Sequence, residues 1–224
     1  MPLRKKTSNS YHHGELATGL LDAVGELTAK FGLEAVSLRA CAKSLGVSPA
    51  AAFRHYADKR ALLTAFATRA LGLLAHEMRA AQKEAKANGE NEFLSIGLSY
   101  VRFALNNPGM FQAMWRRELL DENDEALQAA SNQLGSYLAS GFAGTIPDDD
   151  PNSLSAQELL AWSSVQGLAN LLVDGPVARG QTAGEKLLLA QQMLEALSPS
   201  LAPSLSTSSP LNRAQLSVAS PTGG

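Results

Sequence analysis

Cysteine is almost absent from this 224-residue sequence, and aromatic residues are scarce. The one cysteine, Cys41, cannot form a disulfide within its chain, and its apolar neighbours favour a small buried side chain over a reactive thiol. Aromatic residues make up 6% of the chain, whereas hydrophobic residues make up 45% and are dominated by alanine and leucine, which favour helices. We therefore expect an all-α protein in a reducing cytoplasm.

Long apolar segments are also missing. The longest uncharged stretch of the predicted helices, 159–173, has 15 residues, and these include Ser, Gln and Asn. That is short of the roughly 20 residues needed to cross a bilayer, so we expect no membrane partner. The basic start at Arg4, Lys5 and Lys6 is followed by Tyr11 and two histidines rather than by an apolar run, so we expect no export signal.

The sequence lacks the usual motifs of catalytic sites. It has no G-x-S-x-G, no His-Glu-x-x-His and no phosphate-binding glycine loop, and no segment predicts a strong strand that such loops could follow. His12, His13 and the acidic run 148–150 invite a metal site, but adjacent histidines point in different directions and the acidic run lies in a predicted turn. We expect no enzyme activity, no cofactor and no metal.

Charge is divided unevenly along the chain, although the formal net charge is only −2. Residues 1–69 hold ten Lys or Arg against five Asp or Glu, a net charge of +5. Residues 70–224 hold nine against sixteen, a net charge of −7. The basic N-terminal third is therefore the candidate nucleic-acid-binding part.

Apolar residues recur at spacings of three and four through the first 88 residues, which predicts helices. The first helix has Phe31 on its apolar face, and Gly32 ends it. Ser37, Ser48 and Asp58 are side chains that favour helix N-caps. The predicted helices span 14–31, 38–45 and 49–56, followed by a longer helix from Asp58 towards Asn88.

A second helical block follows Asn88-Gly89. Asn107-Pro108-Gly109 predicts a break between two of its helices. The last two helices carry apolar residues spaced three, four and three apart, as facing helices in a bundle require. From Ser198 the chain is rich in Ser, Pro, Ala and Thr and loses this period, which predicts a disordered tail. The predicted helices of this block lie around 98–105, 110–115 and 127–142, and over 155–173 and 183–197.

Two short helices joined through Gly46 have the layout of a helix-turn-helix, in which the second helix enters the major groove of DNA. Ser48 and Pro49 begin this second helix, and the small residues Ala50 and Ala51 allow its first turn to approach base edges. The candidate DNA-binding residues are Arg4, Lys5, Lys6, Ser37, Arg39, Ser48, Pro49, Ala50, Ala51, Phe53, Arg54, His55 and Lys59.

The roles within this set differ. Arg54 has the length and fork geometry for a phosphate or a guanine edge, while His55 and Lys59 are placed to reach phosphates. The three basic residues of the N-terminal arm would suit a minor groove. A basic helix face is often only a solvated surface, and this alternative stays open for Arg39 and Lys43.

Residues 37–62, SLRACAKSLGVSPAAAFRHYADKRAL, resemble the helix-turn-helix of the TetR (tetracycline repressor) family of bacterial regulators, with the start of its fourth helix. YHHGEL at 11–16, NPGMF at 107–111 and WSSVQGLANLLVDG at 162–175 resemble the subgroup whose C-terminal domain has a Trp-His-Gly signature. The likeness extends from Tyr11 to about Leu197.

The sequence departs from the family pattern at three positions. Phe53 stands where Tyr is common, which removes a hydroxyl that could bond a phosphate. Ala52 replaces a usually larger core residue. Gln166 stands where the subgroup has His, so a role that needs an imidazole does not carry over, although Gln can still donate and accept hydrogen bonds.

The resemblance implies a homodimer that binds a palindromic double-stranded operator and is released, as a repressor, by an unknown small-molecule effector. Activators also exist in the family. The implied organisation is a flexible basic arm (1–13), a helix-turn-helix domain (14–60), an effector-binding and dimerisation domain (61–197) and a disordered tail (198–224).

The resemblance also implies two sets of residues in the C-terminal domain. For the pocket set, an ordinary hydrophobic core is the alternative reading, because Met and aromatic residues at helical spacing usually pack. An effector-independent helical DNA-binding or scaffold protein is the alternative function. The pocket candidates are Tyr100, Phe103, Met110, Phe111, Met114, Trp115, Trp162 and Gln166. The dimer candidates are Trp162, Val165, Ala169, Leu172, Leu187, Ala190, Leu194 and Leu197.

Overall fold

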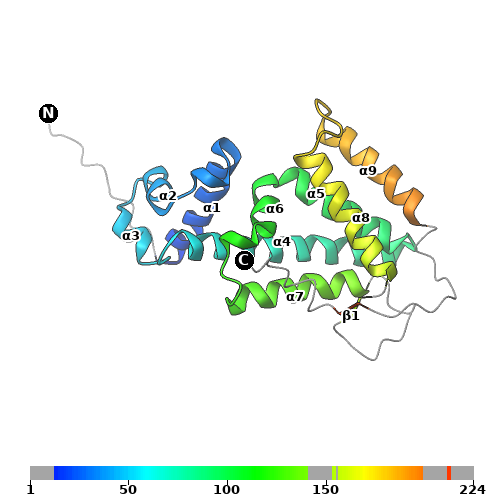
Figure 1. Ribbon diagram of the computed structural model, residues 1–224, viewed down its shortest axis with the longest axis horizontal. Helices are drawn as coiled ribbons and strands as arrows, with labels where there is room; N and C mark the ends of the chain where they lie inside the picture. The colour runs from blue at the N-terminus through cyan, green and yellow to red at the C-terminus, as the bar shows by residue number, and fades with distance from the viewer. Residues whose placement is uncertain (1–12, 141–152, 155, 199–210, 213–224) are drawn as a thin grey trace, which may run out of the picture.

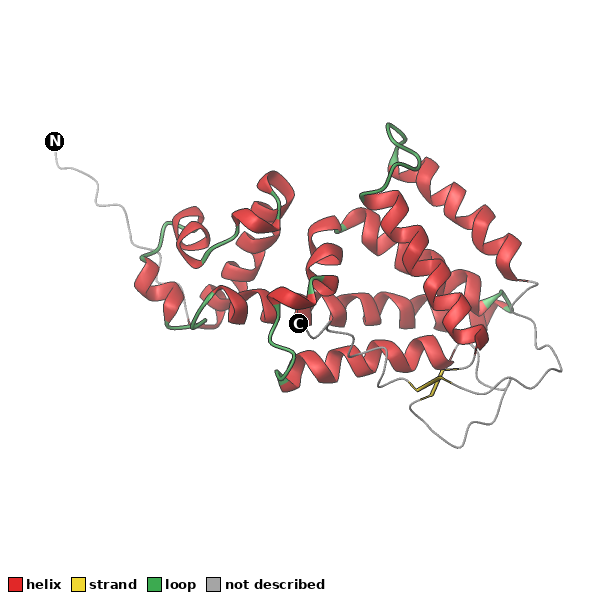
Figure 2. Cartoon of the chain, viewed as in Figure 1, coloured by secondary structure: helices red, strands yellow, loops and turns green. Residues whose placement is uncertain are grey.

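A computed structural model of the chain describes residues 13–140, 153–154, 156–198 and 211–212. These residues are almost entirely helical, which confirms the expected all-α class (Figures 1 and 2). The N-terminal elements are α1 (His13–Phe31), η1 (Leu33–Ala35), α2 (Leu38–Ser44), α3 (Pro49–Phe53) and α4 (Lys59–Asn88). The later helices are α5 (Glu92–Asn106), α6 (Pro108–Trp115), η2 (Arg117–Leu119), α7 (Glu125–Ser140), α8 (Ala156–Val173) and α9 (Ala183–Leu197).

One short strand pair was not predicted. β1 (Ser153–Leu154) pairs antiparallel with β2 (Leu211–Asn212). Each strand has two residues, which is too short to show the alternating apolar pattern by which a strand is predicted from sequence. The basic arm and most of the predicted tail lie outside the described residues.

The three predicted N-caps are confirmed. The side-chain oxygens of Ser37, Ser48 and Asp58 each accept a hydrogen bond from the backbone N–H three residues further on, at 3.1, 3.2 and 2.8 Å. Between the first two caps, Gly46 adopts a φ of +67°, a left-handed conformation that glycine reaches without strain. Local chemistry therefore fixes where α2, α3 and α4 begin.

The second helix of the motif is shorter than predicted. α3 ends at Phe53, so Arg54 and His55 lie in the turn that follows it. Their backbone N–H groups bond carbonyls three residues back, at 3.3 and 3.0 Å, which is the tighter pattern of a closing helical turn. Tyr56 then donates its hydroxyl to the Ala17 carbonyl of α1 at 3.4 Å, which ties the turn to the first helix.

Phe31, which was predicted on the apolar face of the first helix, does not enter the core. Its side chain is 68% exposed, although Leu20 and Val24 of the same helix are fully buried. The chain turns after Phe31 at Gly32, where φ is +80°, and Leu33 enters the core in its place. The helical period alone did not show that the C-terminal end of α1 is no longer covered by other helices.

Helix α4 is the common support of the molecule. It runs from the α1–α3 end along the body, with α7 on one side and α5 and α6 on the other (Figure 1). Helices α8 and α9 pack on α5. Their close approach depends on Gly97 of α5, where an added Cβ would lie 3.0 Å from Leu194 and 3.4 Å from Val165.

A tight junction joins the α1–α3 end to the body. An added Cβ at Gly109 of α6 would lie 2.8 Å from the Thr28 side chain of α1, so only glycine fits this contact without a shift. Nearby, the Asp121 backbone N–H donates to Thr64 Oγ1 of α4 at 2.9 Å. The first helix therefore rests directly on α6.

Candidate DNA interface and interior site

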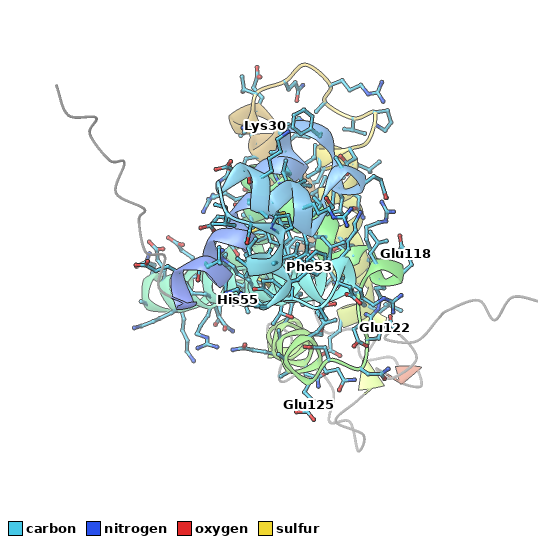
Figure 3. All side chains as sticks on the ribbon, turned by 90° about the vertical axis from the view of Figure 1, so that its left-hand side faces the viewer. Lys30, Phe53, His55, Glu118, Glu122 and Glu125 are labelled. Atoms are coloured by element: carbon cyan, nitrogen blue, oxygen red, sulfur yellow. The ribbon has the colours of Figure 1, made fainter. Side chains whose placement is uncertain are left out.

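The predicted DNA-binding side chains gather at one end of the molecule. Ser48, Pro49, Ala50 and Arg54 are exposed, and Phe53 is 46% exposed, at and just after α3. Figure 3 looks along the molecule onto this end, with Phe53 and His55 within the face. Glu118, Glu122 and Glu125 come from the segment that runs from η2 to the start of α7, which Figure 1 shows set back along α4. The end face thus presents short and basic side chains.

Other residues of the predicted set have definite structural roles. Ser37 and Ser48 use their hydroxyl oxygens as helix caps. Lys59 Nζ donates to the Glu34 carbonyl of η1 at 3.1 Å, so it links α4 to η1. Arg39 is exposed on α2 and Ala51 is half-buried. Arg4, Lys5 and Lys6 lie outside the described residues.

Inside the body, three helices bring predicted pocket residues together. The Tyr100 hydroxyl of α5 donates to Gln166 Oε1 of α8. The Tyr100 ring meets Phe111 of α6 edge-on, with ring centroids 6.0 Å apart and an interplanar angle of 88°. Trp115 ends α6 and meets Trp162 of α8 at 6.3 Å, with the rings tilted by 47°. Gln166 thus takes part as a hydrogen-bond acceptor.

The remaining pocket candidates line the same hydrophobic core. Phe103 and Met114 are buried, and Met110 is half-buried against the core. Side chains this well packed also stabilise the fold, so membership in a ligand site stays a prediction for them.

The buried indole Nε1 atoms of Trp115 and Trp162 make no well-aligned hydrogen bond within the described part of the chain, although the Trp115 side chain lies within hydrogen-bond reach of the Tyr100 hydroxyl. Leaving a buried N–H unpaired costs about 1–3 kcal/mol, so such groups are rare and call for a partner. Among the described residues the Thr28 hydroxyl is also unpaired, but it lies at the α1–α6 junction.

The interior around these donors is uncharged. Burial raises the pKa of Tyr100 far above its ordinary value, and the Trp115 side chain, as a hydrogen-bond donor beside the hydroxyl, offsets this only in part. Tyr100 therefore remains a neutral hydroxyl. The buried polar side chains of the described residues include Thr28, Thr64 and Ser99, and no Asp, Glu, Lys or Arg is among them.

The predicted dimer set needs correction. Five of its members are buried within their own chain, where they pack inside the core, and such residues cannot meet a second copy. The other three are half-buried. The helical period identified an apolar face but could not say that α5 covers it. The five buried residues are Val165, Ala169, Leu172, Ala190 and Leu194.

Four large apolar side chains of the last two helices are exposed instead. Leu160 and Leu171 of α8 are each 42% exposed, and Leu188 and Met193 of α9 are 57% and 47% exposed. Between the α8 leucines, Gly167 has nothing within 4 Å of an added Cβ. The spacing of positions 160, 167 and 171 puts them on one side of α8. This spacing is the sequence signal from which the exposed side of α8 could have been predicted.

An ion pair connects the interior cluster to the DNA-binding end. Arg116 directly follows Trp115, and its guanidinium contacts Glu34 of η1 at 2.9 Å as well as the Glu118 carboxylate. These hydrogen bonds raise the pKa of Arg116 and lower the pKa of Glu118. Sequence analysis missed this link because Arg116 and Glu34 are 82 positions apart.

A capped helix-turn-helix at one end of an all-helical body defines a DNA-binding regulator. The family profile "Bacterial regulatory proteins, tetR family" matches residues 20–66, and the profile "Tetracyclin repressor-like, C-terminal domain" matches residues 93–197. The chain belongs to the TetR family of transcriptional regulators.

Known relatives agree with this assignment. YobS of Bacillus subtilis, described as an uncharacterized HTH-type transcriptional regulator, is 28% identical over 182 residues, covering 81% of this chain and 86% of YobS. A Rhodococcus sp. RHA1 protein of unknown function has a TM-score of 0.65 at 26% identity, over 84% of this chain and 98% of that one. A TetR-family regulator from Streptomyces coelicolor has the same fold, with a TM-score of 0.57 at 21% identity over 84% and 98% of the two chains.

No helix of the described residues is both long enough and apolar enough to span a membrane.

Proposed function

We propose that this TetR-family regulator is a ligand-responsive repressor that binds a palindromic operator as a homodimer. The observation that carries the proposal is the exposed, capped α3 with Arg54 beside it at one end of the molecule. The proposal keeps the four parts expected from the sequence, and it places the protein in the cytoplasm, where the chromosome is found.

The exposed face of α8 and α9 supports the homodimer. Four large apolar side chains on neighbouring helices are costly to leave in water, and an apolar patch of this kind is typical of an interface between subunits. Gly167 leaves room for a partner helix to approach. A two-fold dimer would present two α3 helices to two half-sites about one helical turn of DNA apart.

The junction between α6 and the DNA-binding end supports the ligand response. Trp115 belongs to the interior cluster, and its neighbour Arg116 binds Glu34. A ligand that moved the end of α6 would act on this ion pair and on the Gly109–Thr28 contact. Such a ligand would thereby change the spacing of the two α3 helices.

The test is a titration of the purified protein with fragments of its own promoter region and with scrambled DNA at about 0.15 M salt, where nonspecific binding is weakened. We expect tight binding confined to a palindromic site. Arg54→Ala should weaken it by about tenfold, as for loss of one charged contact. The matched control is Arg102→Ala, which removes an exposed arginine of α5.

Equal, weak binding to both DNAs would instead favour an effector-independent, salt-dominated DNA-binding protein. If Arg54→Ala and Arg102→Ala bound the operator with the same affinity, the assignment of the α3 end as the DNA interface would be wrong.

A further inference from the structure

We propose that α3 recognises its operator through the C5-methyl groups of thymine, which the apolar side chains of Pro49, Ala50 and Phe53 contact in the major groove. The inference rests on the proposed function and deepens it by naming the base feature that the regulator reads. Three observations carry it, namely the composition of α3, the exposure of one of its faces and the length of Phe53 among short side chains.

The composition of α3 limits the ways in which it can read bases. All five of its residues, PAAAF, have side chains without a hydrogen-bond donor or acceptor. Hydrogen-bonded recognition of guanine and adenine edges uses side chains such as Arg, Lys, Asn and Gln. An apolar side chain in the major groove instead recognises the methyl group of thymine. The helix itself is therefore suited to thymine and not to a purine edge.

One face of α3 carries its exposed apolar groups. Phe53 follows Pro49 by four positions and Ala50 by three, so the three side chains share one side of the helix. All three are exposed, whereas Ala51 is half-buried and Ala52 is fully buried in the core. Figure 3 shows Phe53 within the end face of the molecule. The face that α3 presents to DNA is thus apolar.

Phe53 differs from its neighbours in length. Pro49 and Ala50 extend only a short distance from the backbone, so α3 can lie close to the base edges. The Phe53 ring is 46% exposed and is the longest side chain of this face. A phenyl ring has no hydroxyl with which to bond a phosphate, and its contribution to binding comes from the burial of apolar surface against a methyl group.

Polar side chains flank this face at both ends of α3. Ser48 Oγ accepts a hydrogen bond from the Ala51 N–H at 3.2 Å, and its O–H remains able to donate to DNA. Arg54 is exposed directly after the helix. These groups can orient α3 on phosphates or read one flanking base. We therefore expect T·A pairs under the middle of α3 in each half-site, with any guanine read by Arg54 beside them.

The experiment removes single methyl groups from the DNA. Selection from randomised duplex DNA by the full chain first defines the preferred site. Each thymine of that site is then replaced by deoxyuridine, which keeps the base pair and lacks only the methyl group. We expect at least one thymine per half-site whose replacement weakens binding by about fourfold, and by roughly 15-fold when both half-sites are changed. At the same position, 5-methylcytosine should bind about fourfold more tightly than cytosine.

A variant assigns the methyl contact to the ring. Phe53→Ala should weaken binding to the thymine site and abolish the difference between thymine and deoxyuridine at one position. Phe31→Ala is the matched control, because it removes another exposed phenylalanine outside α3 and should leave that difference unchanged. Melting curves would verify that both variants fold, and the comparison of thymine with deoxyuridine needs only the unmodified chain.

Two results would overturn the inference while the regulator function stands. One is a selected site in which no replacement of thymine by deoxyuridine changes the affinity. The other is an equal loss of affinity for thymine and deoxyuridine sites in Phe53→Ala, which would mean that the ring contacts the DNA backbone or only supports the fold. A selection that enriches no sequence would contradict the sequence-specific regulator and this inference together.

Discussion

The DNA-binding end and the interior cluster differ in how their side chains are positioned and in how far they are exposed to solvent. At α2 and α3, Ser48 and Arg54 are exposed, and each lies within a few residues of the cap or turn that positions it. In the body, Tyr100, Trp115 and Gln166 come from three different helices, and the bond between Tyr100 and Gln166 joins positions 66 apart. The exposed end is organised by local backbone chemistry, whereas the interior site exists only when α5, α6 and α8 are packed together.

The two regions nevertheless both pack on α4. Disrupting this packing should have the largest effect on stability. Phe66 of α4 is fully buried, and an added Cβ at Gly25 of α1 would contact its ring at 3.8 Å. Phe66→Ala should cost about 3–5 kcal/mol of stability because it leaves a cavity between the regions. We expect a melting temperature roughly 10 °C lower in a calorimetric scan, still with a single transition. Two separate transitions would mean that the regions fold independently.

The next prediction compares two exposed leucines, one on the proposed dimer face of α9 and one elsewhere. Leu188→Glu places a charge on the proposed dimer face, and Leu73→Glu does the same on α4, where the leucine is 41% exposed. Leu188→Glu should give monomers and weaken binding to a palindromic operator by about 100-fold, because the second half-site no longer adds affinity. Leu73→Glu should change neither. Sedimentation and operator titration would measure both, and a dimeric Leu188→Glu protein would refute the proposed face.

The link between the two regions can be tested without knowing the effector. Coupling between sites is reciprocal, so operator binding at α3 should change the tryptophan emission of the interior cluster. Arg116→Ala removes the contact with Glu34 and should abolish most of this change, with little effect on stability, because exposed ion pairs contribute little to it. Arg117→Ala is the matched control, since Arg117 pairs with Glu122 at similar exposure. Equal responses from both variants would exclude the ion pair as the link.

The prediction with the smallest expected effect distinguishes two roles of Ser48, helix capping and DNA contact. Ser48→Ala removes the cap of α3 and should cost about 1 kcal/mol of stability, measured by chemical unfolding. Ser48→Asp keeps a capping oxygen and should preserve stability, but its charge would repel phosphate and weaken operator binding. If Ser48→Asp bound the operator as well as the unmodified chain, Ser48 would be a cap and no more.

The outcome of the sequence predictions follows the same division. Caps at Ser37, Ser48 and Asp58 and the break at Asn107 were predicted because they depend on residues within a few positions of each other. Five of the predicted dimer residues on α8 and α9 are buried within their own chain, and Phe31 is exposed rather than buried. A periodic pattern shows that a helix has an apolar face, but not which neighbour covers it.

The sequence by itself determined the all-helical class, the starts of the short helices and the register of the helix-turn-helix, because propensity, capping and glycine conformation act over a few residues. Only the tertiary structure decided that Trp115 and Trp162 meet, and that Arg116 binds Glu34. It also decided that Leu188 is exposed while Leu194 is buried. These facts depend on contacts between helices distant in sequence, and such contacts are set by packing of the whole body.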